Sequence, residues 1–171
     1  MLVGLPLRTA SRVVDMATFG FGVLRAPGVP AAAVSAPQPA IAEYRLHVQE
    51  LWRIVRDGRL SVGYADYFYP PRGSTTARED FVARDATRTR RDDLLDDWLG
   101  HAAADHVVAA VQGTVAGDLG ILFADGCRLE TFTTAATTDP DGGSDEMWRL
   151  IPPRIAGEEP KLVVTAHGIE H

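Results

Sequence analysis

The chain has 171 residues, of which 46% are hydrophobic and 23% are charged, with a formal net charge of −6 and a single cysteine. This amount of apolar material excludes a disordered chain, and one cysteine excludes an internal disulfide scaffold. The sequence has no run of about 18 apolar residues, which excludes a transmembrane helix of ordinary length. The length fits one domain spanning residues 1–171.

The charge is unevenly distributed along the chain. Residues 1–86 carry 10 basic and 8 acidic side chains, whereas residues 87–171 carry 7 basic and 15 acidic side chains. An acidic half disfavours nucleic acid and anionic membranes, which are themselves negative. It favours a basic protein partner, or it serves solubility alone. The opening residues lack the basic and uninterrupted apolar regions of a signal peptide, so we expect a cytoplasmic protein with a reduced thiol.

The first strand pattern covers residues 13–23 and is followed by a Pro/Ala-rich stretch at residues 25–40. The four prolines of this stretch prevent both a helix and a central strand, which predicts an extended surface loop. Residues 44–49 alternate apolar and polar side chains, as a half-buried strand does.

Two Asp-Gly pairs predict tight β-hairpins, because both turn residues must reach positive φ. Asp57-Gly58 joins residues 52–55 to residues 60–64. Asp125-Gly126 joins residues 119–123 to residues 127–132 in the same way. Further strands are expected at residues 107–115, 147–151 and 161–166, and residues 133–145 have the composition of a long polar loop.

One short amphipathic helix is predicted at residues 89–99. Thr89 and Asp92 have the spacing of a capping box, with aspartate in place of the usual glutamate. Apolar side chains then recur at helical spacing, and Gly100 is a natural stop.

Similar strand patterns recur in about residues 12–70 and 105–168. Tyr44-Arg45-Leu46, Trp52-Arg53-Ile54 and Leu60-Ser61-Val62 resemble, in the same order, Cys127-Arg128-Leu129, Trp148-Arg149-Leu150 and Leu162-Val163-Val164. The recurrence indicates two pseudo-repeated β-meanders that pack on each other or share one sheet, unless short strand patterns coincide by chance. The fold class is therefore α+β, mainly antiparallel sheet with one short helix.

The acidic residues of the predicted helix form the pairs Asp92/Asp96 and Asp93/Asp97, four residues apart. They superficially resemble the aspartate-rich motif of prenyl-diphosphate enzymes, but the large helical fold and second acidic motif of that family are missing. A solvated helix face that can meet a basic partner is the better interpretation. The candidate partner-binding residues are Asp92, Asp93, Asp96, Asp97, Tyr67 and Tyr69.

The histidines and the cysteine lack the spacing of a metal or catalytic site. His101 and His106 are five residues apart and do not align on one helix face. Cys127 falls in a predicted strand, where a lone cysteine is typically a small buried apolar side chain. We therefore predict no catalytic, cofactor-binding or metal site, and no cofactor.

Several short segments resemble a family of small β-rich actinobacterial proteins without an assigned function. They are Leu46-His47-Val48-Gln49 with Trp52-Arg53-Ile54, the hairpin at residues 123–130, Trp148-Arg149-Leu150 and residues 163–168. Similar small β-rich domains occur among the immunity proteins of toxin systems. The resemblance implies no particular functional residue.

Three features favour a non-enzymatic protein that binds another protein and occludes or sequesters it. They are the acidic second half, the lack of a catalytic pattern, and the aromatic side chains of Tyr64, Tyr67, Phe68 and Tyr69. One alternative is a small-ligand-binding domain or enzyme with its site between two sheets. The other is a structural subunit of a larger assembly.

Overall fold

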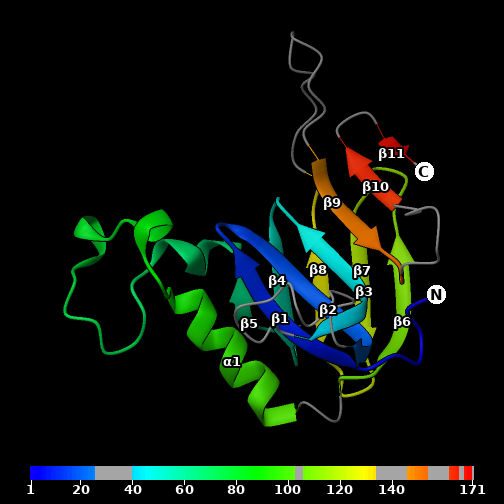
Figure 1. Cartoon of the computed structure of the whole chain (residues 1–171), viewed down its shortest axis with the longest axis horizontal. Coiled ribbons are helices and arrows are strands. Elements are labelled where there is room, and N and C mark those ends of the chain that lie inside the picture. The colour runs from blue at the N-terminus through cyan, green and yellow to red at the C-terminus, as the bar shows by residue number, and fades with distance from the viewer. Residues whose placement is uncertain (26–39, 103–105, 134–145, 154–161, 166–167, 171) are drawn as a thin grey trace, which may run out of the picture.

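The computed structural model describes residues 1–25, 40–102, 106–133, 146–153, 162–165 and 168–170. Its strands form two antiparallel sheets, one with the order β1-β2-β3-β9-β10-β11 and one with the order β5-β4-β8-β7-β6 (Figure 1). Strands of the six-stranded sheet are β1 (Leu7–Val13), β2 (Met16–Arg25), β3 (Ile41–Val48), β9 (Glu146–Ile151), β10 (Leu162–Thr165) and β11 (Gly168–Glu170). Strands of the five-stranded sheet are β4 (Trp52–Arg56), β5 (Arg59–Gly63), β6 (Val108–Gly113), β7 (Leu119–Phe123) and β8 (Arg128–Thr131).

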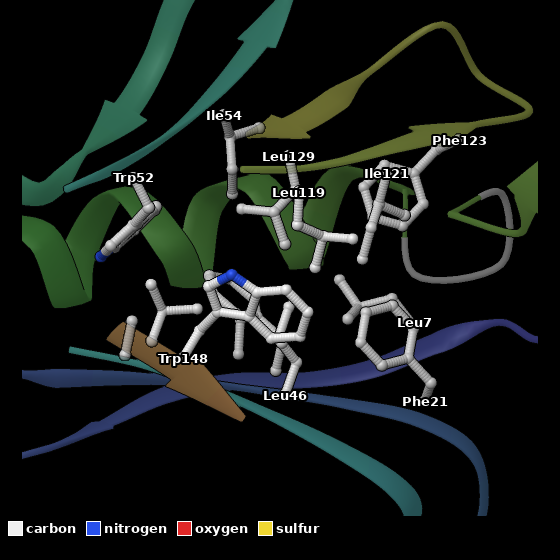
Figure 2. Packing of buried hydrophobic residues seen from close by; sticks show 14 of the residues in the cluster. Leu7, Phe21, Leu46, Trp52, Ile54, Leu119, Ile121, Phe123, Leu129 and Trp148 are labelled. Carbon is white, nitrogen blue, oxygen red and sulfur yellow. The ribbon is translucent and has the colours of Figure 1, made fainter. Parts of the chain in front are cut away.

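The two sheets face each other across one apolar core, because alternate residues of each strand are apolar and point inward. In Figure 2, Leu7, Phe21, Leu46 and Trp148 of the six-stranded sheet meet side chains of the five-stranded sheet. The five-stranded sheet contributes Trp52, Ile54, Leu119, Ile121, Phe123 and Leu129. Apolar side chains thus fill the space between the two sheets.

Helix α1 (Arg90–Ala102) contacts β1, β5 and the 3₁₀ turn Tyr64–Phe68, so it lies along one side of the two sheets (Figure 1). Its buried apolar residues are Leu95 and Trp98 on the predicted apolar stripe. The Asp92 carboxylate accepts a hydrogen bond from the Thr89 backbone N–H at 2.7 Å, which is one half of the predicted capping box. In the part of the chain that the structure describes, α1 is the one α-helix.

These elements confirm a mainly antiparallel sheet fold with one helix, and both Asp-Gly hairpins are present. The helix does not stop at Gly100 but continues to Ala102. No helix among the described residues is long and apolar enough to cross a membrane.

The prediction of one strand at residues 13–23 is wrong, because Val13 is the last residue of β1 and a tight turn at Val14 and Asp15 separates it from β2. Val14 has a φ of 58°, a conformation that β-branched residues rarely adopt. No glycine or proline marks this turn, so local turn chemistry does not predict it. Tyr64 also leaves the strand and begins a 3₁₀ turn.

Three sequence predictions fall wholly or partly outside the described residues. Of the Pro/Ala-rich loop predicted at residues 25–40, residues 26–39 lie outside, and of the polar loop predicted at residues 133–145, residues 134–145 lie outside. The ends of the predicted last strand also lie outside, while its centre forms β10.

The same pattern of strand pairing occurs in both sheets. Strand β3 pairs with β9 in one sheet, and β8 pairs with β4 in the other. The opposed residues are Leu46–Leu150 and Val48–Trp148 in the first pair, and Leu129–Ile54 and Thr131–Trp52 in the second. The register also shifts at matching places in β1, after Leu7, and in β6, after Val108.

Candidate functional site

The carboxylate of Asp92 is part of the contact between α1 and β1. Its Oδ2 lies 2.9 Å from Arg12 Nε, and both side chains are largely buried. Asp92 also accepts the hydrogen bond from the Thr89 N–H that begins the helix. This carboxylate therefore stabilises the fold and does not present a free charge to a partner.

The other three helix aspartates also face arginines of the same chain. Arg88 lies 2.9 Å from Asp93 and 2.6 Å from Asp96, while Arg72 forms an ion pair with Asp97. Burial raises the pKa of Asp93, but hydrogen bonds from the Arg72 backbone and from Arg88 outweigh burial, so the net shift is downward. The cluster is thus locally compensated, although Asp96 and Asp97 remain exposed at 62% and 48% of their side-chain surface.

The two tyrosines differ sharply in exposure. Tyr67 is buried at 4%, with the guanidinium of Arg91 4.7 Å from its ring centre. A partner cannot reach a side chain in this position, so the assignment of Tyr67 to a binding surface is wrong. Tyr69 is half-buried and stacks under the guanidinium of Arg78 at 4.2 Å.

Strand β6 forms an edge of the five-stranded sheet. Ala109, Val111, Gln112 and Gly113 are exposed along it. The outer face of β6 and its neighbours carries a shallow groove of about 490 Å³. Lining residues of this groove include Ala110, Gln112, Asp118, Leu122, Glu130 and Phe132.

A cluster of titratable side chains gathers at the end of the β7–β8 hairpin. His106 Nδ1 lies 2.9 Å from Asp125 Oδ2, and the ligand atoms of His106, Asp125 and Cys127 all lie within 4.8 Å of one another. Arg56 reaches this cluster from β4, with its Nε 2.9 Å from Cys127 Sγ and an Nη 3.0 Å from the Asp125 carboxylate.

The local structure explains how these groups come together. The Asp125 carboxylate accepts a hydrogen bond from the Cys127 backbone N–H at 3.1 Å, which holds the turn. His106 lies just before β6 in the chain. It is fully buried against Trp98, and the centres of the two rings are 4.2 Å apart. Burial raises the pKa of Asp125, but hydrogen bonds from Cys127 and Arg56 and the charge of His106 produce a net decrease.

Sequence reasoning missed this cluster. Asp125 was interpreted only as a turn residue, and Cys127 only as a buried strand residue. Arg56 is 71 residues from Cys127 in the chain, so no short sequence pattern predicts their contact. The one sequence signal for the cluster is the Asp125-Gly126-Cys127 turn, which places a carboxylate and a thiol two residues apart.

His47 lies on the outer face of the six-stranded sheet beside Arg149. Its Nδ1 accepts a hydrogen bond from Arg149 Nε at 3.2 Å. Burial, together with the charges of Arg149 and Arg45, lowers the pKa of His47 to about 4. The imidazole is therefore neutral at physiological pH.

Comparison of the chain with protein-family models, with curated proteins and with solved structures finds no match. The case for a function therefore depends on the geometry described above.

Proposed function

We propose that this chain is a non-enzymatic protein-binding domain, of the immunity-like or sequestering kind, that receives an extended segment of another protein along β6. The observation that carries the proposal is the edge of β6 beyond Val108: residues 4–7 bond to the beginning of this edge, but no described strand pairs with the rest of it. A free strand edge presents unpaired N–H and C=O groups, and a partner segment can complete them by adding a strand.

The backbone of β6 is oriented for this addition. Thr114 N–H bonds to the Asp118 carbonyl on the β7 side of the strand. Because hydrogen-bonding direction alternates along an antiparallel strand, the N–H and C=O groups of Val111 and Gly113 point away from β7. Among the described residues, no backbone group bonds to Val111 or Gly113 on this side, which leaves the two residues open to a partner strand.

The composition of β6 also lacks the features that normally protect an edge. Residues 107–115 contain no charged residue and no proline. The edge strand β1, by contrast, carries Arg8 and Arg12 and contacts α1. Charged side chains and covering helices are the usual means of blocking strand addition.

A pseudo-repeat of the two halves supports the comparison between β1 and β6, and we propose it here as well. The matched registers described above give β1 and β6 equivalent places. A further match lies in the backbone, where Gly22 N–H bonds to the Pro6 carbonyl and Ala124 N–H bonds to the Val107 carbonyl, at 2.9 and 2.8 Å. In this interpretation, the β1 edge is charged and covered by α1, and the equivalent β6 edge is left for a partner.

The partner that we propose has a basic segment. Residues 87–171 carry 15 acidic against 7 basic side chains, and this half contributes β6 and most of the groove beside it. Opposite charge accelerates association and makes it sensitive to salt. We place the protein in the cytoplasm, where its one cysteine would stay reduced.

A capture experiment with matched edge variants tests the proposal. Val111→Lys places a charge on β6, where Val111 is 38% exposed, and Val13→Lys makes the same change on β1, where Val13 is 58% exposed. We expect the unchanged chain and Val13→Lys to capture the same identified protein from lysate, more at low salt than at high salt. Val111→Lys should capture at least about tenfold less of it.

Equal capture by Val111→Lys, or capture of no protein at either salt, would overturn the proposal. Light scattering of the purified chain tests the alternative that the chain is a structural subunit of a larger assembly. A dimer that Val111→Lys dissociates would assign the β6 edge to a second copy of this chain and would replace the proposal of a foreign partner.

A further inference from the structure

The geometry points to a zinc-class metal site formed by His106, Asp125 and Cys127 at the end of the β7–β8 hairpin. These residues offer one nitrogen, one oxygen and one sulfur ligand, all within 4.8 Å of one another. A donor set of imidazole, carboxylate and thiolate is typical of Zn²⁺, and Mg²⁺ or Ca²⁺ would require oxygen ligands. The site is independent of the binding edge proposed above.

The orientation of His106 is the strongest indication. Its Nε2 lies 3.3 Å from the Trp98 carbonyl oxygen, which can only accept a hydrogen bond, so Nε2 carries a proton. The other ring nitrogen, Nδ1, lies 2.9 Å from the Asp125 carboxylate. Either a proton on Nδ1 or a metal ion held by the two groups would satisfy this contact.

Nδ1 is also a buried polar atom that has no hydrogen-bond partner among the described residues, although it lies close to the carboxylate. His106 itself is fully buried. Buried polar groups in native proteins are almost always satisfied, and an unsatisfied one commonly marks a missing water or ion. A metal-bound histidine usually donates its second ring N–H to a backbone carbonyl, which is the arrangement of His106 and Trp98.

The distances allow the three ligands to close on an ion. Zinc bonds of about 2.0–2.3 Å in a tetrahedron place ligand atoms roughly 3.3–3.8 Å apart. His106 Nδ1 and Asp125 Oδ2, now 2.9 Å apart, would separate slightly, and spacings of up to 4.8 Å would contract by up to about 1 Å, which side-chain torsions of Asp125 and Cys127 can supply. Three protein ligands leave one tetrahedral position for water or an external ligand.

Arg56 occupies the place of the cation in this structure. Its guanidinium contacts both Cys127 Sγ, at 2.9 Å, and the Asp125 carboxylate, at 3.0 Å. The Arg56 side chain is 39% exposed, so it can turn outward into solvent when a metal ion takes its place. The guanidinium and the metal ion thus compete for the same two ligands.

The fold does not require this cluster. The strand pairing gives Leu5 and Tyr44 the positions in the first half that His106 and Cys127 have in the second. An apolar and an aromatic side chain therefore complete the same corner elsewhere in the chain. This difference indicates that the histidine and cysteine have a role besides packing.

Metal titration of the purified full-length chain tests the site after treatment with a chelator. Zn²⁺ is added in a calorimeter, and Co²⁺ is added in a spectrophotometer, where a thiolate ligand gives a charge-transfer band in the near ultraviolet. We expect one ion per chain and a thiolate band. Cys127→Ser should abolish the band and weaken Zn²⁺ binding by at least about tenfold.

Arg56→Met is the decisive variant, because it removes the competing cation and leaves all three ligands in place. We expect it to strengthen Zn²⁺ binding by about tenfold. His47→Gln, which removes a histidine far from the cluster in the fold, should bind as the unchanged chain does. Circular dichroism spectra verify that each variant is folded.

No heat and no thiolate band in both the unchanged chain and Arg56→Met would overturn the proposal and leave a purely ionic cluster. A band that survives in Cys127→Ser, or Zn²⁺ affinity that Arg56→Met leaves unchanged or weakens, would also overturn it.

Discussion

Arg12 and Asp92 join the first described strand to the helix across 80 residues of sequence, with Arg12 Nε 2.9 Å from Asp92 Oδ2. The same guanidinium donates hydrogen bonds to the carbonyls of Val14, Ala86 and Thr87. One side chain thus holds the β1–β2 turn, the segment before α1, and the first turn of α1 together.

Arg12→Met should destabilise the protein by about 2–3 kcal/mol, because it leaves the largely buried Asp92 carboxylate unpaired. Urea unfolding monitored by circular dichroism measures the change. Arg8→Met on the same strand is the matched control, since Arg8 is exposed, and it should shift stability by no more than about 0.5 kcal/mol. Equal losses in the two variants would contradict the role of Arg12.

Gly117→Ala should be more destabilising than Gly126→Ala. Both glycines have positive φ, at 95° and 84°, so alanine is strained by about 1 kcal/mol at either position. At Gly117 the added Cβ would also lie 2.6 Å from Val164 Cγ1, whereas at Gly126 it meets open space. We expect a loss of about 2–4 kcal/mol for Gly117→Ala and about 1 kcal/mol for Gly126→Ala in urea unfolding.

The Gly117 position has a second constraint, since its carbonyl accepts a hydrogen bond from Trp148 Nε1 at 2.7 Å. Displacement of this backbone should therefore alter the near-ultraviolet circular dichroism of Gly117→Ala. Similar stabilities and spectra for the two alanine variants would refute the contact argument.

Arg91→Met should leave stability unchanged or raise it by about 1–2 kcal/mol. Arg91 is fully buried, and its Nη2 donates a hydrogen bond to the Asp15 carbonyl at 2.9 Å, but its Nε and Nη1 have no partner among the described residues. Burial lowers the pKa of this guanidinium, which means that the folded state disfavours its charge. A methionine of similar length avoids this desolvation, and a loss above about 2 kcal/mol in chemical unfolding would contradict the prediction.

The lowered pKa of His47 predicts a stability that decreases with acidity. The group has a pKa of about 4 in the folded chain and 6.5 as its ordinary value. Between these pH values the unfolded chain binds the proton more readily than the folded chain does. The stabilising contribution of His47 is therefore complete above pH 6.5 and is lost as pH falls towards 4.

After allowance for solvent screening of this half-buried group, the contribution is about 1–2 kcal/mol. Unfolding free energies of the unchanged chain and His47→Gln, measured at several pH values in this window, provide the test. The variant should show the shallower pH dependence. Parallel curves would mean that other groups cause the loss.

The sequence predicted most of the elements that depend on near neighbours. The alternation in β3 predicted a half-buried strand, and the two Asp-Gly pairs predicted the hairpins after Arg56 and Phe123. The helix and half of its cap followed from spacing alone. These features are local, because a turn or a helical turn is decided within about four residues.

The turn at Val14 is the exception among local features. A β-branched residue adopts a positive φ there, and strand pairing between β1 and β2 maintains it against its intrinsic preference. Propensity alone could not have located it.

The candidate sites depend on contacts that only the tertiary structure makes. Four aspartates of α1 formed an acidic face in the sequence, but folding brings Arg12, Arg72 and Arg88 to them from other segments. His106 and Asp125 are far from Arg56 in the chain and meet only because the strands pair in their observed order. Composition and periodicity determined which residues become strands and helix, since local backbone preferences and side-chain alternation suffice for that. Sheet order and register decided which charges are neutralised and which edge stays bare, because those depend on the long-range packing of the core.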